Sequence, residues 1–463
     1  MKRFFMNGHS NQKSDINQST QYPKCFIGLL ILVMLMGMLS SCTQKAVDTN
    51  EPTAESTSPS ASAATNTPEA ESTKAPIEIK YMTFSAAPDH LEDLDAMIAE
   101  FESQNTDIKI TYETYSFADY FTKLQTVVAS KTAPDTFELN YENFVTYASK
   151  KALYNMDDLM KADTDFDSSI FNSTALNAFR YDNKQYGLVE SFSNVVFFYN
   201  KDLFDKANLD YPNESWTWKD ELAAAQKLTD ADAGIFGTYA PVQFWEFYKT
   251  IEQNGGKIFN ADKTEVLIDS KENIETLQWM IDKIEKYHVS PSDAQMSGQS
   301  DGDLFRAGKI AMLRTGIWMF DSFKDADFAW DIALEPGNTQ KAHHFFANGV
   351  AISKDTKNAE AAWKWVKFLT SSKEAAQIRV DSSWELPALT DETLLTSYLE
   401  KTPPESRDVV FKALDTLVVP PVIGNWNELT DLVGKELDQA KLGQKTPEQA
   451  LKDAKTAIEG ILE

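Results

Sequence analysis

The stretch that decides the fold runs from residue 77 to residue 140 and reads IEIKYMTFSAAPDHLEDLDAMIAEFESQNTDIKITYETYSFADYFTKLQTVVASKTAPDTFELN. Its first segment alternates Ile77, Ile79 and Tyr81 with polar residues, which is the period of a β-strand. The same period returns at 108–112, and a third strand is predicted at 135–139. Between the strands, apolar residues recur on one face of a helix. These faces are carried by Leu91, Leu94, Met97, Ile98 and Phe101, and by Phe121, Leu124, Val127 and Val128.

Strands separated by helices of this length predict a parallel sheet that is covered by helices on both faces. The fold class is therefore α/β. Later segments are mostly helical, with start signals at Thr217 for a helix over 218–228 and at Ser270 for the next. The sequence Thr446-Pro-Glu-Gln449 combines an N-cap, a first-turn proline and a Gln at the third position, which predicts a terminal helix.

Composition and charge exclude several classes of protein. The chain has 463 residues, and 44 Lys and Arg against 70 Asp and Glu give a formal net charge of -26. Binding to nucleic acid through phosphates needs clustered basic residues, so a nucleic-acid partner is not expected. Two cysteines in the whole chain rule out a framework of disulfides.

The N-terminal segment predicts export and anchoring. A basic leader precedes an apolar run at 26–39, which as a helix would be about 20 Å long and too short for a hydrocarbon core of about 30 Å. The run ends in Leu39-Ser-Ser-Cys42, which resembles a bacterial lipobox. We expect residues 1–41 to be a lipoprotein signal peptide and Cys42 to carry the lipid. The alternative is an ordinary cleaved signal with an incidental cysteine.

Residues 42–76 are expected to form the lipid anchor and a disordered tether, because this stretch is rich in Ser, Thr, Ala, Pro and Glu and cannot build a core. Acyl chains would hold the protein at the cell membrane, on its extracytoplasmic face, without spanning it. A long tether with no second domain suits a cell with one membrane and an exposed outer face. A Gram-positive source is therefore a hypothesis.

Motifs of the common enzymes are missing from the sequence, which contains no G-x-x-x-x-G-K-[ST], G-x-S-x-G, H-E-x-x-H or paired C-x-x-C. His343 and His344 would point in opposite directions in a strand, which argues against a metal site. We expect no enzyme activity, no metal and no cofactor. A pair of carboxylates at glycosidase spacing cannot be recognised in a sequence with 70 acidic residues, so a glycoside-active enzyme stays an alternative.

Short segments of residues 77–463, taken in their order along the chain, resemble the solute-binding proteins of bacterial ABC importers. The resemblance is specifically to the sugar-binding family that includes maltose-binding protein. The segments are Asp119–Thr126, Thr132–Phe137, Tyr186–Leu188 with Phe198–Phe204 and Ser215–Leu222, Asn254–Gly256, Phe305–Met312 with Gly316–Trp318, Gly349–Lys354 and Gly443–Leu451. Each segment is weakly specific by itself. Their order along the chain makes the resemblance specific.

The resemblance implies two α/β lobes with a ligand cleft between them, as in periplasmic binding proteins. By that analogy, lobe 1 holds 77–190 and 349–385, and lobe 2 holds 191–348 and 386–463. The protein would be a monomer that delivers a carbohydrate to the permease subunits of an ABC transporter, whose ATPase lies on other chains. This polypeptide would then make or break no covalent bond, and its mechanism would be closure of the two lobes around the ligand.

Sugars present apolar C–H faces and hydroxyl groups, so their sites need aromatic platforms with carboxylates and amides. The resemblance places Trp245 at an aromatic stacking position and Trp318 in the Gly-x-Trp element. It also places Phe84 after the first strand, where some relatives carry an aromatic facing the cleft. Trp384 and Trp426 are further candidates. Packing in the core of a lobe is the alternative for each tryptophan.

Polar candidates follow strand ends, where ligands sit in open α/β sheets. Asp135, Glu138 and Asn140 lie on or just after the third strand. Asp135 matches an Asp of the family, and the alternative for it is a role in the fold instead of in ligand binding. The remaining candidates lie in the expected crossovers between the lobes: Glu190, Ser193, Asn194 and Asn348.

Two alternatives to a receptor for an oligosaccharide stay open. In the first, the same fold binds a peptide, a polyol or another polar solute. In the second, the protein is a surface enzyme that acts on glycosides. The identity, linkage and length of the sugar are not readable from the residues.

Overall fold

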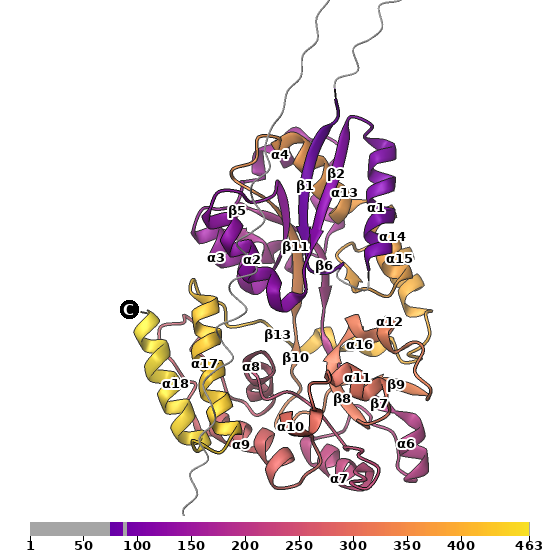
Figure 1. Cartoon of the computed structure of the whole chain (residues 1–463), viewed down its shortest axis with the longest axis vertical. Helices are drawn as coiled ribbons and strands as arrows, with labels where there is room; N and C mark the ends of the chain where they lie inside the picture. The colour runs from indigo at the N-terminus through magenta and orange to yellow at the C-terminus, as the bar shows by residue number, and fades with distance from the viewer. Residues whose placement is uncertain (1–74, 87–89, 463) are drawn as a thin grey trace, which may run out of the picture. The chain divides into compact units, whose positions relative to one another are not determined.

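The computed structural model describes residues 75–86 and 90–462, which all belong to one compact unit (Figure 1). The expected signal peptide 1–41, the candidate lipidation residue Cys42 and the tether up to residue 74 lie outside the described residues. Among the described residues, the structure contains no helix with both the length and the apolar character needed to cross a membrane.

A large mixed sheet combines strands from both halves of the chain (Figure 1). In order across the sheet, its strands are β12 (Leu386–Pro387), β6 (Gly187–Ser193), β11 (Phe346–Ile352), β3 (Thr136–Asn140), β1 (Ile77–Thr83) and β2 (Ile108–Thr114). β1 pairs in parallel with β2 and β3, as the sequence predicts. β11 is antiparallel to both β3 and β6, so the sheet is mixed beyond the three strands for which the sequence predicts parallel pairing.

Smaller sheets lie further along the chain. They comprise β8 (Met312–Gly316), β7 (Val195–Asn200) and β9 (Trp330–Ala333) in one antiparallel sheet, β10 (His343–His344) with β13 (Leu417–Val418), and β4 (Arg180–Tyr181) with β5 (Lys184–Gln185). The chain passes from the large sheet to the antiparallel sheet between β6 and β7, where Asn194 is the single intervening residue. It returns through β10 and β11. The expected crossovers between the lobes lie near these two passages, and the lobe boundaries stay a prediction.

Helices make up most of the remaining chain. They are α1 (Leu91–Gln104), α2 (Phe117–Ala129), α3 (Tyr141–Ser149), α4 (Asp157–Ala162), α5 (Ser173–Ala178), α6 (Lys201–Lys206), α7 (Trp218–Leu228), α8 (Phe244–Gln253), α9 (Lys271–Glu285), α10 (Asp293–Met296), α11 (Asp301–Arg306), α12 (Phe320–Phe323), α13 (Ala359–Ser371), α14 (Lys373–Asp381), α15 (Glu392–Leu399), α16 (Asp408–Lys412), α17 (Trp426–Lys441) and α18 (Pro447–Leu462). Short 3-10 turns occur at Ser168–Ile170, Ile317–Met319 and Ala413–Thr416.

The helix start signals of the sequence are confirmed. Thr217 and Asp220 form a capping box at the start of α7, and the Ser270 side chain accepts a hydrogen bond from Asn273 N at the start of α9. Both caps satisfy backbone N–H groups that have no partner inside the helix. α18 begins at Pro447, as its N-terminal sequence predicts.

Helices cover both faces of the large sheet. Leu188 and Val350 pack in one apolar cluster with residues of α1 and α13, whereas their neighbours Val189 and Ala351 pack in another with residues of α2 and α3. Successive side chains of a strand point to opposite faces, so each face has its own core. The prediction that helices cover both faces is therefore confirmed.

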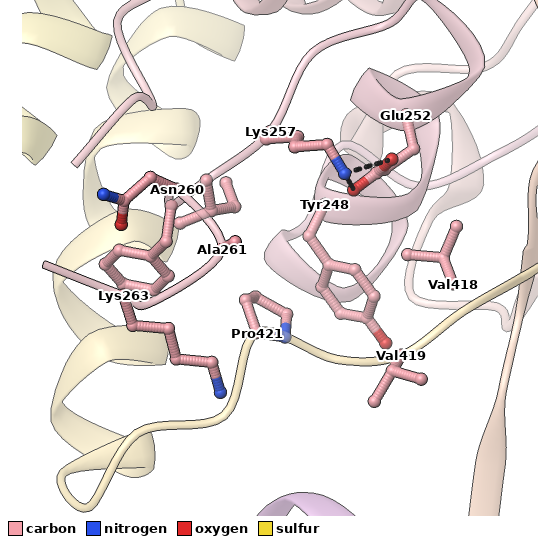
Figure 2. Close-up of a pocket in the computed structure, with 11 residues that line it drawn as sticks. Tyr248, Glu252, Lys257, Asn260, Ala261, Lys263, Val418, Val419 and Pro421 are labelled. Carbon is pink, nitrogen blue, oxygen red and sulfur yellow. Dashed lines mark hydrogen bonds and ion pairs between the residues drawn. The ribbon is translucent and has the colours of Figure 1, made fainter. Parts of the chain in front are cut away.

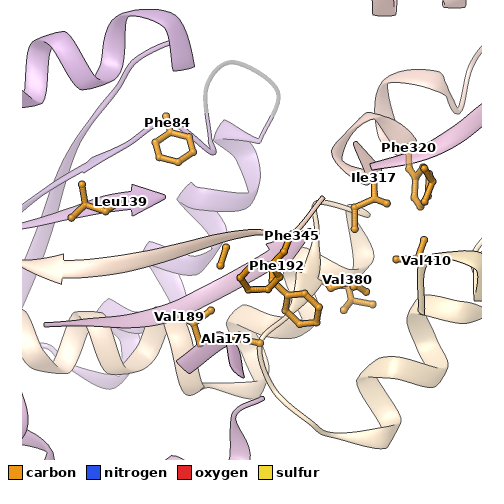
Figure 3. Packing of buried hydrophobic residues seen from close by; sticks show 14 of the residues in the cluster. Phe84, Leu139, Ala175, Val189, Phe192, Ile317, Phe320, Phe345, Val380 and Val410 are labelled. Atoms are coloured by element: carbon orange, nitrogen blue, oxygen red, sulfur yellow. The ribbon is translucent and has the colours of Figure 1, made fainter. Parts of the chain in front are cut away.

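The second of these clusters continues beyond the large sheet. Figure 3 shows Leu139, Val189 and Phe192 of the large sheet in the same cluster as Ile317 and Phe320, which follow β8. A separate cluster joins α8, α9, α17 and α18. The polar residues described below lie at one end of the large sheet, next to the passages from β6 to β7 and from β10 to β11.

Candidate ligand-binding site

The ends of β3, β6 and β11 bring several predicted polar residues into register. Asn348 on β11 lies opposite Asn140 on β3 and opposite Ser191 on β6, and Phe346 lies opposite Ser193. Residues that are distant in sequence thus share one end of the sheet. Register of this kind follows from pairing of strands and places side chains of neighbouring strands close together.

Glu385, a residue that the sequence analysis did not select, lies between these polar groups. Its carboxylate accepts hydrogen bonds from the Ser191 hydroxyl and from Asn348 Nδ2, at 3.2 Å for the closer oxygen. Burial raises the pKa of Glu385 to about 7, against the opposing hydrogen bonds from Ser191 and Ser193. Together Ser191, Ser193, Asn348 and Glu385 form what we call the polar floor. Glu385 immediately follows the candidate Trp384, and this adjacency was the one signal in the sequence that could have identified it.

Glu190 is held by an ion pair instead of facing an open space. Its Oε1 pairs with Arg379 Nη2, and Arg379 Nη1 donates to Leu369 O at 2.8 Å. Oε2 of Glu190 has no hydrogen-bond partner among the described residues. One side of this carboxylate is therefore committed to the fold, and the other is available to a ligand or to water.

The structure places Trp384 in an apolar cluster. Its ring stacks on His90 with 4.3 Å between ring centroids and 9° between planes, and Arg379 lies 5.4 Å from its centroid. Only 5% of Trp384 is exposed. Trp426 is similarly buried and packs against Phe244 in the cluster of α8 and α17. A ligand contact of either ring stays a prediction that these packing partners do not favour.

Glu138 holds the turn after β1. Its carboxylate accepts hydrogen bonds from Thr83 Oγ1, from Phe84 N at 3.1 Å and from Ser85 N at 3.0 Å, and burial raises its pKa. Phe84 is in turn packed against rings of α2. Asp135 accepts hydrogen bonds from Lys80 N and Thr356 Oγ1, which link β1 to the segment after β11. All three residues thus have structural partners.

Asn140 and Asn194 are also used by the fold. Asn140 Oδ1 caps α3 by accepting from Asn143 N at 3.2 Å, and Asn194 Nδ2 donates to Val410 O at 2.8 Å. Oδ1 of Asn194 has no hydrogen-bond partner among the described residues although it is buried. Such an atom costs free energy unless water or a ligand satisfies it.

Glu142 is a second residue that the sequence analysis missed. It lies in the first turn of α3, is 5% exposed, and its Oε2 has no partner in the described part of the chain. Burial raises the pKa of Glu142 to about 7. Its helical neighbours Tyr141, Val145 and Thr146 face the second half of the chain, because the first two pack against the α8–α17 cluster and Thr146 donates to Gly424 O. No pattern in the sequence separates Glu142 from the other carboxylates.

Trp245 and Trp318, which the resemblance places at the ligand, belong to one line of aromatic rings. Ring centroids are 5.3 Å apart for Trp245 and His344, 5.0 Å for His344 and Phe346, and 5.9 Å for Phe346 and Trp318. Trp245, Phe346 and Trp318 are partly exposed, whereas His344 is fully buried. We call these four residues the aromatic row. Phe346 was not selected from the sequence, although the apolar pair Phe345-Phe346 before Asn348 was visible.

The aromatic row and the polar floor meet at β11. Phe346 belongs to the aromatic row and pairs with Ser193, while Asn348, two residues further on the same strand, contacts Glu385. An arrangement of exposed aromatic faces beside carboxylate, amide and hydroxyl groups suits a polar molecule with apolar faces.

A network of buried charges includes residues of α8, the helix that carries Trp245. Lys249 of α8 pairs with Glu246 at 2.9 Å and with Glu335, and Arg314 of β8 pairs with Glu335 at 3.1 Å and with Glu221 of α7. Burial alone would raise the pKa of Glu221, but Arg314 and Lys283 lower it to about 2. The network therefore joins α7, α8 and β8 by ion pairs from which water is excluded.

His343 and His344 point to different partners, as expected for neighbours in a strand. His343 Nε2 accepts from Glu335 N, and His344 Nε2 lies 2.6 Å from Trp245 O. Within residues 75–86 and 90–462, no group of three or more His, Cys, Asp or Glu side chains is arranged to hold a metal ion.

A pocket of about 190 Å³ is lined by residues of α8 and of the segments 257–263 and 418–421 (Figure 2). Its lining includes Tyr248, Lys263 and Pro421, and a 3.4 Å pair of Lys257 with Glu252 closes one wall. None of the twelve residues selected from the sequence lines this pocket. It adjoins the aromatic row through Tyr248, whose ring centroid lies 5.5 Å from that of His344.

Comparisons with known proteins identify the family and the fold of the chain. The family model described as bacterial extracellular solute-binding protein matches residues 87–376. A solved ABC substrate-binding protein of Listeria monocytogenes, in complex with cycloalternan, is 51% identical with a TM-score of 0.82, over 84% of this chain and 99% of that chain. The maltooligosaccharide ABC transporter solute-binding lipoprotein of Streptococcus pneumoniae is 25% identical over 82% of this chain and 88% of its own length.

More distant structures share the fold. The receptor GacH of Streptomyces glaucescens, solved without ligand and with acarbose, is 20% identical with a TM-score of 0.75, over 84% of this chain and 99% of that chain. The fold of the present chain is thus the two-lobed α/β fold of periplasmic binding proteins, in which the ligand cleft lies between the lobes. The exact boundaries of the two lobes stay a prediction.

Proposed function

This chain belongs to the family of bacterial extracellular solute-binding proteins, and from this premise we propose that it is a carbohydrate receptor that delivers an oligosaccharide to an ABC transporter permease. The observation that carries the proposal is the aromatic row beside the polar floor. Partly exposed Trp245, Phe346 and Trp318 offer faces on which the C–H surfaces of sugar rings stack. Asn348 and Glu385 offer acceptors and donors to hydroxyl groups.

Cycloalternan is the first ligand to test. The solved protein that binds it is 51% identical to this chain, and the two chains align over almost the whole length of that protein. Maltooligosaccharides and arabinooligosaccharides form the comparison set, because relatives of lower identity are named for them. Closure of the lobes, not covalent chemistry, would retain the ligand.

A thermal-shift screen tests the proposal. The full-length chain, in a detergent without a sugar headgroup, is heated with each oligosaccharide and with monosaccharides, polyols and peptides. A ligand present at about 1,000 times its Kd stabilises the folded state by roughly 4 kcal/mol, which raises the melting temperature measurably. A rise with oligosaccharides supports the proposal. A rise only with a peptide or a polyol would replace the ligand class, and release of smaller sugars on incubation would indicate an enzyme.

The residues that we propose to contact the ligand belong to the aromatic row or to the polar floor. Trp245 and Trp318 are the stacking platforms, with Phe346 between them. Ser193 and Asn348 of the floor are the hydrogen-bonding residues, together with Glu385. The remaining candidates support the site through the fold: Phe84, Asp135, Glu138, Asn140, Glu190, Asn194, Trp384 and Trp426.

Anchoring at Cys42 is part of the proposal, supported by the lipobox-like sequence and by a relative named as a lipoprotein. Growth of the source cells with labelled palmitate should label the wild-type protein and leave Cys42→Ser unlabelled. Protease treatment of whole cells should release the body of a protein tethered outside a single membrane. Resistance until an outer membrane is broken would contradict the Gram-positive assignment.

A further inference from the structure

His344 occupies the middle of the aromatic row. Its Nε2 is 2.6 Å from the carbonyl oxygen of Trp245, and its ring stacks on Phe346 at 5.0 Å with 14° between planes. The Tyr248 ring meets the imidazole edge-on at 5.5 Å. His344 itself is fully buried, so it cannot serve as an exposed platform. It contacts residues on both sides of the row.

The hydrogen bond determines the tautomer of His344. A carbonyl oxygen can only accept, so Nε2 carries the proton and donates it, and Nδ1 is left without a partner among the described residues. Burial and the neighbouring Lys249 lower the pKa of His344 to about 3, with Glu246 and the Trp245 carbonyl opposing. The imidazole is therefore neutral at physiological pH, and the hydrogen bond persists.

His343 provides an internal comparison. It is equally buried on β10, but its hydrogen-bond partners, Glu335 and Thr416, lie outside the aromatic row. Its Nε2 accepts from Glu335 N at 3.1 Å, so its Nδ1 carries the proton and donates to Thr416 Oγ1 at 2.8 Å. Adjacent histidines thus hold opposite tautomers. One is tied to the charge network and the other to the ligand-facing rings.

We propose that His344 is a positioning residue of the ligand cleft, which fixes the spacing of the Trp245 and Trp318 platforms by binding the Trp245 carbonyl and stacking on Phe346. The inference rests on the proposed function, because it needs a ligand that bridges the platforms. The Trp245 carbonyl belongs to the first turn of α8, so the hydrogen bond sets the position of that turn relative to β10 and β11. Spacing of platforms selects among sugars whose rings lie at different separations, which makes His344 a determinant of specificity.

The test compares substitutions at the two histidines in the full-length chain. His344→Leu removes the donor and the ring, and His344→Gln keeps an N–H donor at nearly the same reach. His343→Leu and His343→Gln are the matched controls of equal burial. Affinity for cycloalternan and for linear oligosaccharides is measured by calorimetry and referred to the folded fraction. ¹⁹F spectra of 5-fluorotryptophan protein, assigned with Trp245→Phe and Trp318→Phe, report the environment of each platform.

His344→Leu should lower affinity roughly tenfold, the factor carried by one net hydrogen bond, and should change the ratio between cyclic and linear sugars. The Trp245 and Trp318 resonances should shift, and His344→Gln should restore most of the affinity. Equal losses at both histidines, or a lower melting temperature with unchanged affinity per folded molecule, would overturn the inference. If His344→Leu does not fold, failure of His344→Gln to keep wild-type affinity and ligand ratios would overturn it. Absence of sugar binding in the wild type would instead refute the proposed function.

Discussion

At the scale of single residues, the candidate site contains two kinds of tryptophan. Trp318 is partly exposed, lies at one end of the aromatic row and packs on Gly316 and Phe346. Trp384, in contrast, is enclosed by His90 and Arg379. A ring with a free face can stack on a sugar without moving. A ring enclosed on both sides contributes mainly to the stability of the fold.

Trp318→Ala should therefore weaken binding of the oligosaccharide by about 1–3 kcal/mol and leave the fold intact, as loss of one aromatic platform would. Calorimetry gives the affinity, and thermal unfolding gives the stability. Trp216, which is also partly exposed but packs beside Phe204 away from the row, supplies the control Trp216→Ala. If Trp318→Ala lost stability while each folded molecule kept its affinity, Trp318 would be a core residue.

Glu385 makes a prediction about pH. Its pKa is raised from the ordinary value of 4.5 to about 7, so between these values the folded protein holds a proton that the unfolded chain has lost. Its contribution is complete below about pH 4.5 and is lost as the pH rises through 7. At about 1.4 kcal/mol per pKa unit, the loss amounts to roughly 3 kcal/mol.

Glu385→Gln is uncharged at every pH and should not show this loss. The melting temperature of the variant relative to that of the wild type should thus rise between pH 5 and pH 8. Glu374→Gln, at an exposed position of α14, is the control and should follow the wild type throughout. A pH-independent difference for Glu385→Gln would mean that this carboxyl is not desolvated.

At the scale of elements, the buried ion pairs connect segments that share little other contact with one another. Arg314 reaches from β8 to Glu221 of α7 and to Glu335, which precedes β10. All three side chains are at most 1% exposed. Removing one partner of such a network leaves an uncompensated charge in a medium of low polarity.

Arg314→Met should consequently lower the free energy of unfolding by about 3–5 kcal/mol, measured by denaturant titration. Arg306 pairs with Asp303 at the surface, so Arg306→Met should change it by less than about 1 kcal/mol. Equal effects of the two substitutions would show that the buried network is no more important than a surface pair.

Patterns in the sequence predicted individual strands and helices well, because side-chain alternation and helix caps depend on residues that are close together in the sequence. Alternation placed β1 and β2, and caps at Thr217, Ser270 and Thr446 placed three helices. The antiparallel β11 was not predicted, because its place between β3 and β6 depends on pairing with strands that precede it by more than 150 residues. Alternation carries no information on the direction of a partner strand.

The site was predictable in part for the same reason. Residues named through the resemblance, such as Trp245 and Trp318, were found because they lie in recognisable segments. Glu385 meets Ser191 across 194 positions of sequence, and His344 joins two rings that approach from different elements. Such contacts exist only in the folded chain, and therefore no spacing in the sequence could reveal them.

At the scale of the whole molecule, the two-lobed fold makes binding and closure one process. A ligand shifts the balance toward the closed form only by its extra contacts in that form. We expect the oligosaccharide to reduce the radius of gyration in small-angle X-ray scattering. Trp318→Ala should require a higher sugar concentration for the same change, and an unchanged radius at saturating ligand would contradict closure.

Calorimetric titration of the wild-type chain with cycloalternan tests the central claim most directly. The account predicts saturable binding with one sugar per chain and a negative heat-capacity change, because stacking on the aromatic row buries apolar surface. Binding of the same stoichiometry by a linear oligosaccharide would still place a carbohydrate in the site. An absence of heat with every oligosaccharide, in protein that melts cooperatively, would contradict the claim that this chain is a carbohydrate receptor.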